Sequence, residues 1–149
     1  MDAKEKLLWS IALPGFGQLL NGRYLKGFFF ILCEVVINVQ SNLNEVIMLS
    51  FNGEIGKAIQ QTDYQWLLFY PCLYFFAMWD AFKDAGGGKE PYSFLPFLLL
   101  SYFLTIAVIY SARFELFGVL FGPVWFPIIC VFPGVLISLI LKKILNMNK

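Results

Sequence analysis

One carboxyl group lies deep within the first long apolar run of this 149-residue chain. Along a helix, Glu34 lies roughly 16 Å beyond Arg23, near the middle of a hydrocarbon core about 30 Å thick. An ionised carboxylate there costs on the order of 3 kcal/mol or more, so it must be protonated, paired or hydrated. Asn38 follows one helical turn later on the same face. The two residues are either a proton or cation site, or a neutral contact that fixes the register of packed helices.

A second candidate contact joins the ends of two predicted helices. Arg23 stands at the start of the first apolar run, and Asp80 stands at the end of the second. Because the two runs would cross a membrane in opposite directions, we expect both side chains at the same depth, where an ion pair would hold the N-terminal segment in place. Lys83, one turn beyond Asp80, competes as its partner.

The composition argues against several other kinds of chemistry. The chain has no histidine, which removes the commonest general base and metal ligand. Its three cysteines lie in apolar runs without a CxxC spacing and are interpreted as small buried hydrophobic residues. The GGGK sequence at 86–89 lacks P-loop spacing. We therefore expect no catalytic residues, no metal and no cofactor, and a net charge of +1 gives no reason to expect nucleic acid as a partner.

The apolar content favours a membrane as the solvent of the chain. Hydrophobic residues make up 59% of the sequence and charged residues only 14%, which is more apolar surface than a soluble domain of this size can bury. Lipid does not tolerate open strands. We predict an all-α integral membrane protein, with a single domain over 1–149 and four transmembrane helices, at 24–45, 64–82, 92–111 and 116–141.

Two connecting regions carry further local signals. The outer loop over 41–63 is expected to form a helical extension and a short amphipathic cap. The last predicted span carries Pro123, Pro127 and Pro133, and Gly118 and Gly122 have a GxxxG spacing. This pattern indicates a kinked and closely packed helix.

The distribution of basic residues predicts the orientation. With four spans and a cytoplasmic N-terminus, only Lys57 and Arg113 of the 11 basic residues fall on the outer side. The remaining basic residues fall inside, and they are Lys4, Lys6, Arg23, Lys26, Lys83, Lys89, Lys142, Lys143 and Lys149. Because basic residues favour the cytoplasmic side, we expect both termini in the cytoplasm of a multi-pass cell-membrane protein.

Within the segment over 3–22, the stretch at 7–20 is too short to cross the membrane at helical rise. Pro14 interrupts it by removing a backbone donor, and Gly15 and Gly17 permit a sharp reversal of the chain. We expect a short interfacial or re-entrant helix and an elbow that docks on the bundle. Neither glycine should then have room for a side chain.

The polar residues of the same segment have expected roles as well. Gln18 and Asn21 should supply hydrogen bonds to the backbone groups that Pro14 leaves free, since lipid cannot. Asn21 and Gly22 also form a second turn signal before the first long helix.

These motifs resemble a loose family of small bacterial membrane proteins related to the TM2 domain. Such proteins carry a PGxGQxYNGxxxKG-type segment and a helix that ends in W-D-A-aromatic-basic. The resemblance covers about the first 85 residues, and Leu20 stands where an aromatic residue is usual. The matching residues are Pro14, Gly15, Gly17, Gln18, Asn21, Gly22, Lys26, Gly27, Trp79, Asp80, Ala81, Phe82 and Lys83.

The resemblance implies a bacterial plasma-membrane protein but no particular reaction. We therefore expect an accessory or structural membrane component whose partners are the lipid bilayer and another membrane protein or a second copy of the chain. A proton- or ion-coupled transporter or channel subunit that uses Glu34 is the main alternative. A lipid-processing membrane enzyme is a further alternative, but it would need clustered Asp, Glu or His residues at an interface.

Overall fold

The structure is a computed structural model that describes residues 2–147, and most of them are helical. The helices and strands, in chain order, are α1 (Ala3–Ala12), α2 (Phe16–Leu20), α3 (Tyr24–Ser41), α4 (Leu43–Phe51), α5 (Ile55–Gln61), α6 (Tyr64–Leu67), α7 (Tyr70–Asp84), α8 (Leu95–Tyr110), β1 (Glu115–Leu116), β2 (Val119–Leu120) and α9 (Gly122–Met147). The prediction of an all-α fold class is confirmed, apart from one very short hairpin.

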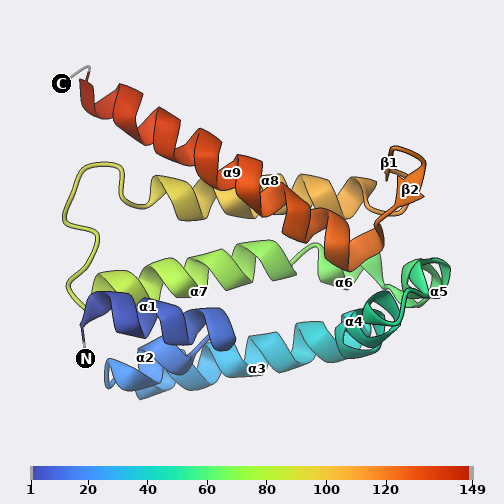
Figure 1. The fold of residues 1–149 in the computed structure, drawn as a ribbon. Coiled ribbons are helices and arrows are strands. Elements are labelled where there is room, and N and C mark those ends of the chain that lie inside the picture. Colours follow the sequence, from blue (N-terminus) through green and yellow to red (C-terminus); the bar gives the residue numbers. More distant parts are fainter. Residues whose placement is uncertain (1, 148–149) are drawn as a thin grey trace.

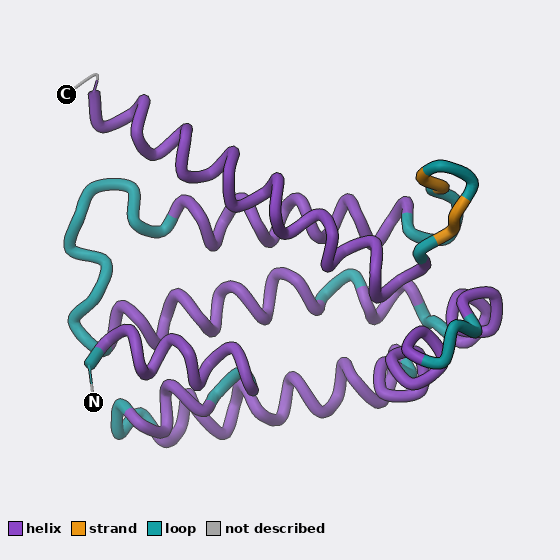
Figure 2. The backbone as a smooth tube through the Cα atoms, in the orientation of Figure 1, coloured by secondary structure: helices purple, strands orange, loops and turns teal. Residues whose placement is uncertain are grey.

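Four longer helices form the body of the molecule. In Figure 1, α7 lies between α3 and α8, and α9 lies across α8. The start of α1, the end of α9 and the loop between α7 and α8 share one end of the bundle, called here the terminal end. The opposite end, called the hairpin end, carries the two short strands and also the helices α4 and α5 (Figure 1 and Figure 2).

The main core lies where α7, α8 and α9 meet. Phe75 and Met78 of α7 pack on Leu100 of α8, and Leu7 of α1 and Val131 of α9 join this cluster. Helix α1 therefore belongs to the bundle, because it supplies a core side chain and packs along α7.

The first predicted span, over 24–45, is wrong at its C-terminal end. Helix α3 ends at Ser41, and Asn42 has a left-handed backbone with a φ of 58°. Asparagine adopts this conformation more readily than most residues because its short polar side chain bonds locally. The chain then turns into α4 and α5, which agree with the expected helical extension and cap. Trp125 of α9 holds this cap by donating from Nε1 to the carbonyl of Ser50, at 3.0 Å.

The second predicted span, over 64–82, is split in two. Helix α6 ends at Leu67 and α7 begins at Tyr70. Pro71 explains the break, because it has no N–H group to donate to the carbonyl four residues earlier. Leu68 and Phe69 nevertheless keep right-handed helical backbone angles.

The third predicted span, over 92–111, begins too early. Tyr92 has a left-handed φ of 56°, which no helix accommodates, and Pro96 lies in the first turn of α8. Proline is tolerated there because its missing N–H would have no partner in a first turn.

The last predicted span, over 116–141, begins in a hairpin. Glu115 pairs with Leu120 and Leu116 with Val119, so Phe117 and Gly118 form the turn. Both have left-handed φ values, 53° and 76°, as a two-residue type I′ turn requires. Gly118 therefore does not lie on α9, and the proposed GxxxG stripe is wrong.

Among residues 2–147, two helices are long and apolar enough to cross a membrane. These are α3, with 18 residues, and α9, with 26. By comparison α7 has 15 residues and α8 has 16, so each covers only about 23 Å at helical rise. Four transmembrane helices are thus not supported by helix length alone.

The outward faces of these helices are strongly apolar. Leu25 and Phe28 on α3, and Phe132 on α9, are exposed over 91%, 65% and 74% of their surface. Contiguous apolar surface of this kind marks an interaction with a membrane or a protein partner. The two apolar helices and these faces favour a membrane location.

An ion pair ties the loop at the terminal end to α9. Lys142 Nζ donates to Glu90 Oε2 at 2.8 Å. Lys142 lowers the pKa of the Glu90 carboxyl group below its ordinary value of 4.5, mainly through this hydrogen bond and then through its charge. The lowered pKa means that the pair stabilises the fold above the unfolded-state pKa, and that this contribution is lost as pH falls through the folded-state value.

We therefore expect Glu90→Gln to lower the thermal midpoint slightly at neutral pH, and to have no effect near pH 3. The effect should be small because the Glu90 side chain is 78% exposed. Thermal melts of both proteins between roughly pH 3 and pH 7 would measure it. Lys142→Gln should give the same profile. A difference between Glu90→Gln and wild type that persisted at the lowest pH would contradict the assignment.

Candidate functional site

Two glycine residues let the N-terminal segment lie directly on the bundle. Gly15 has a left-handed φ of 104°, and a Cβ atom there would lie 2.5 Å from the carbonyl oxygen of Gly27 in α3. A Cβ atom at Gly17 would collide with Ser10 Oγ and would lie 2.6 Å from Cβ of Ala81 in α7. The expectation that neither glycine has room for a side chain is confirmed.

The other elbow residues have distinct positions. Pro14 is fully buried at the turn between α1 and α2. Gly22 has a left-handed φ of 72°, and nothing lies within 4 Å of where its Cβ would be. Gly22 is therefore required by the backbone conformation of the second turn and not by close packing.

The amide of Gln18 is buried between the elbow and α7. Its side chain has no exposed surface. Nε2 donates to the carbonyl of Ala77 at 2.8 Å and to Oδ2 of Asp80 at 3.1 Å. A single side chain thus binds both the backbone and a carboxylate of the same helix.

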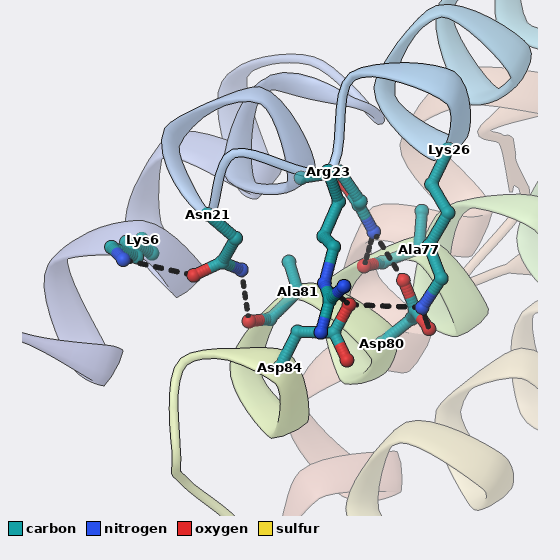
Figure 3. A network of polar contacts seen from close by, with 9 residues as sticks. Lys6, Asn21, Arg23, Lys26, Ala77, Asp80, Ala81 and Asp84 are labelled. Carbon is teal, nitrogen blue, oxygen red and sulfur yellow. Dashed lines mark hydrogen bonds and ion pairs between the residues drawn. The ribbon is translucent and has the colours of Figure 1, made fainter.

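Asn21 repeats this contact one turn further along α7. Its Nδ2 donates to the carbonyl of Ala81 at 2.8 Å, while its Oδ1 accepts a hydrogen bond from Lys6 Nζ at 2.9 Å (Figure 3). The asparagine therefore connects α1, the turn after α2, and α7.

Charged groups complete the contact at the terminal end. Lys26 Nζ lies 2.8 Å from Oδ1 of Asp80 and 2.9 Å from Oδ2 of Asp84, and Arg23 Nε lies 3.7 Å from Asp84 Oδ2 (Figure 3). We call this network the clasp, and its residues are Gln18, Asn21, Arg23, Lys26, Ala77, Asp80, Ala81 and Asp84.

The predicted pair of Arg23 with Asp80 is wrong. Helices α3 and α7 run in opposite directions, so the deeper basic residue, Lys26, meets the deeper carboxylate, Asp80. Arg23, which precedes the first turn of α3, meets Asp84 at the very end of α7. The expected competitor Lys83 takes no part in the clasp.

The prediction of the groups to which Gln18 and Asn21 hydrogen-bond is also wrong. They bind carbonyls of α7, not the backbone groups that Pro14 leaves free. The carbonyl of Ile11, near the interrupted end of α1, instead accepts a 2.6 Å hydrogen bond from the Tyr74 hydroxyl of α7. The elbow is therefore held on α7 from both sides of the break.

The spacing of charged residues in the sequence could have identified Lys26 and Asp84, the two ion-pair partners that the sequence analysis does not predict. Asp80 and Asp84 are one helical turn apart, as are Arg23 and Lys26, so two basic groups could face two carboxylates. Lys6 and Tyr74 carry no comparable signal, because their contacts depend on how α1 folds back over α7.

The second polar site lies inside the bundle, around Glu34. The side chain is 6% exposed, and its Oε2 atom has no hydrogen-bond partner among residues 2–147. The side chain of Tyr70 is the neighbour that acts on this carboxyl group, and the ring of Tyr74 stacks on Tyr70 with the ring centroids 5.6 Å apart. Asn38 lies elsewhere, because its Nδ2 donates to Oδ1 of Asn44 at 3.1 Å.

The described part of the chain holds no cluster of three His, Cys, Asp or Glu side chains that could bind a metal ion. Cys33, Cys72 and Cys130 are free thiols, but the expectation that they are buried is wrong, because Cys72 is exposed and the other two are partly exposed. Comparison with protein-family models, with curated proteins and with solved structures finds no match to this chain.

Gly17→Ala should lower the stability of the protein in detergent by about 1–3 kcal/mol, because the new methyl group would overpack the contact with α7. The matched control is Gly56→Ala, on an exposed face of α5 with nothing within 4 Å. Alanine is the better helix former at such a position, so the control should be neutral or slightly stabilising. Thermal melts of both variants measure the difference, and equal midpoints would show that the elbow is not docked as described.

Proposed function

We propose that the chain is an integral membrane protein with four crossings that serves as a structural or accessory component, not as a catalyst. The observation that carries this proposal is that the polar side chains of the clasp form contacts between helices. Gln18, Asn21 and Lys26 are all engaged in holding helices together. The outward faces of α3 and α9, which remain available to lipid or a partner, are apolar.

Three further features support four crossings with cytoplasmic termini. Helix α1 begins and α9 ends at the same end of the bundle in Figure 1, as an even number of crossings requires. Most basic residues of the described chain lie toward that end, on α1, at the start of α3, at the end of α7 and on the last turns of α9, as the cytoplasmic side of a membrane favours. Finally, residues 64–84 keep right-handed backbone angles through the break before Pro71, so α6 and α7 together would cover about 30 Å.

A relationship to TM2-like bacterial membrane proteins is part of the same proposal. The two halves of the resembling motif are far apart in the sequence, yet they meet in the clasp. Gly17 packs on Ala81, Gln18 binds Asp80, and Lys26 pairs with Asp80. A motif whose halves form one contact is consistent with a structural role, and the proposed partners are the lipid bilayer and another membrane protein or a second copy.

Cysteine labelling in intact cells tests the number of crossings. The three native cysteines are first replaced by serine, and a reporter is then placed at Asn52→Cys or at Lys89→Cys, both on exposed positions. A membrane-impermeant maleimide should label the Asn52 reporter directly, and the Lys89 reporter only after permeabilisation. If α3 and α9 were the only crossings, the Lys89 reporter would also be labelled from outside, and the four-crossing proposal would fail.

A second candidate function is proton or cation passage at Glu34. It is favoured by one observation, namely a buried carboxyl oxygen without a partner beside the hydroxyl of Tyr70. Ionisable residues within membrane helices are rare and mark ion pathways or proton relays. Glu34→Gln keeps the size and hydrogen-bonding capacity of the side chain but cannot carry a proton.

In vesicles that contain the purified protein and a pH-sensitive dye, an imposed membrane potential should drive proton entry through the wild type. Glu34→Gln should reduce that entry to the level of empty vesicles without lowering the thermal midpoint. Glu45→Gln, an exposed acid on α4, is the control and should conduct normally. Wild-type vesicles no leakier than empty ones would remove this second function and leave Glu34 as a packing residue.

A further inference from the structure

An apolar groove of about 950 Å³ runs between α3, α7 and α8. Its floor is α7, which lies between the other two helices in Figure 1. The lining is apolar except for indole N–H groups, two thiols and the hydroxyl of Ser101. Leu32 and Leu98 on its rim are 62% and 55% exposed, so the groove opens outward, toward lipid if the helices cross a membrane as proposed.

A basic residue follows the groove floor along α7, one helical turn beyond the last lining residue. Cys72, Phe76 and Trp79 of α7 line the groove, and they recur at the three- and four-residue spacing of a single helix face. Lys83 continues that face by one more turn, at the terminal end. Lys83 is exposed, and its side chain has no hydrogen bond or ion pair among the described residues.

The clasp leaves Lys83 as an available positive charge beside the groove. Asp80 and Asp84, its acidic neighbours on α7, are engaged by Lys26 and Arg23. Trp79 lies between the apolar floor and Lys83, where an indole ring would sit at the level of lipid head groups. A lysine at this depth extends its ammonium group toward phosphate and packs its methylene stem on apolar surface.

We propose that the groove binds an acyl chain of an anionic phospholipid whose head-group phosphate contacts Lys83, an inference that rests on the proposed membrane crossing. The volume falls within the range of small-molecule sites. The chemistry of the walls favours a lipid chain over a helix. Helices that associate in membranes approach through Gly, Ala and Ser, whereas this groove is walled by bulky rings such as Trp66, Phe94 and Phe97. A flexible chain can follow such an irregular surface.

Fluorescence quenching by brominated lipids tests the site. The sequence contains 4 tryptophans, and replacing Trp9, Trp66 and Trp125 with Phe leaves Trp79 as the reporter. The protein is reconstituted with phosphatidylglycerol or phosphatidylcholine that carries identical brominated chains. We expect phosphatidylglycerol to reach half-maximal quenching at a several-fold lower mole fraction. Lys83→Gln should abolish this preference. Lys143→Gln is the control and should retain it, because Lys143 is an exposed residue of α9, which contributes no residue to the groove lining.

A second measurement avoids the tryptophan substitutions. Cys72 is exposed and lines the groove, so unbrominated phosphatidylglycerol should slow its alkylation in the wild-type protein several-fold more than phosphatidylcholine does. Peptide mass spectrometry separates its modification from that of Cys33 and Cys130.

Equal effects of the two lipids in both measurements, or a preference unchanged in Lys83→Gln, would overturn the proposal. Cross-linking of Cys72 between two copies, with no quenching by either lipid, would assign the groove to a second copy instead. The labelling of Lys89→Cys in the same membranes separates the lipid-site proposal from the four-crossing proposal on which it rests. Inside labelling without lipid preference rejects only the lipid site, whereas outside labelling rejects the four crossings.

Discussion

The buried amide of Gln18 sets the position of the elbow on α7. A fully buried polar side chain must find its partners within the protein, because leaving an amide unpaired costs on the order of 1–3 kcal/mol. The Nε2 group of Gln18 meets this requirement on α7 by donating to the carbonyl of Ala77 and to Asp80, whereas Oε1 has no partner among residues 2–147. Once that contact forms, Asn21 reaches the carbonyl of Ala81, and Gly17 must pack without a side chain against the same helix. The register of the elbow therefore follows from one hydrogen-bonding requirement.

Local signals in the sequence predict the elbow well, whereas contacts between helices are less predictable. Pro14 and Gly15 act on the backbone within a few residues, so their effect can be read directly. Which basic residue meets Asp80 depends on the rotation of α3 and on its offset along α7, and a shift of one residue turns a side chain by about 100°. The position of a residue along the helix predicts its depth in the bundle but not the direction in which its side chain points. Lys26, not Arg23, therefore pairs with Asp80.

Helix ends were mispredicted for a related reason. The hydrophobicity of a segment does not show where its backbone reverses direction. The apolar residues around Phe117 and Gly118 were therefore assigned to a span, although they form a hairpin turn. Asn42 and Tyr92 end the neighbouring helices because their backbone angles are left-handed. Each is a single residue next to an apolar run, so the average hydrophobicity of the run hardly changes. The resulting short helices α7 and α8 would need flanking turns, or a locally thinner bilayer, to complete a crossing.

Helix α7 carries most of the interactions on which both proposals depend, and its faces have different chemistry. Asp80 and Asp84 face the elbow, Phe75 and Met78 face the core, and the face that ends in Lys83 forms the groove floor. These faces are coupled by charge. An anionic head group at Lys83 would be repelled by two carboxylates on neighbouring turns if they were free, but Lys26 and Arg23 already neutralise them. The clasp would thus do more than hold the elbow, because by engaging the acids of α7 it leaves the charge of Lys83 unopposed at the mouth of the groove.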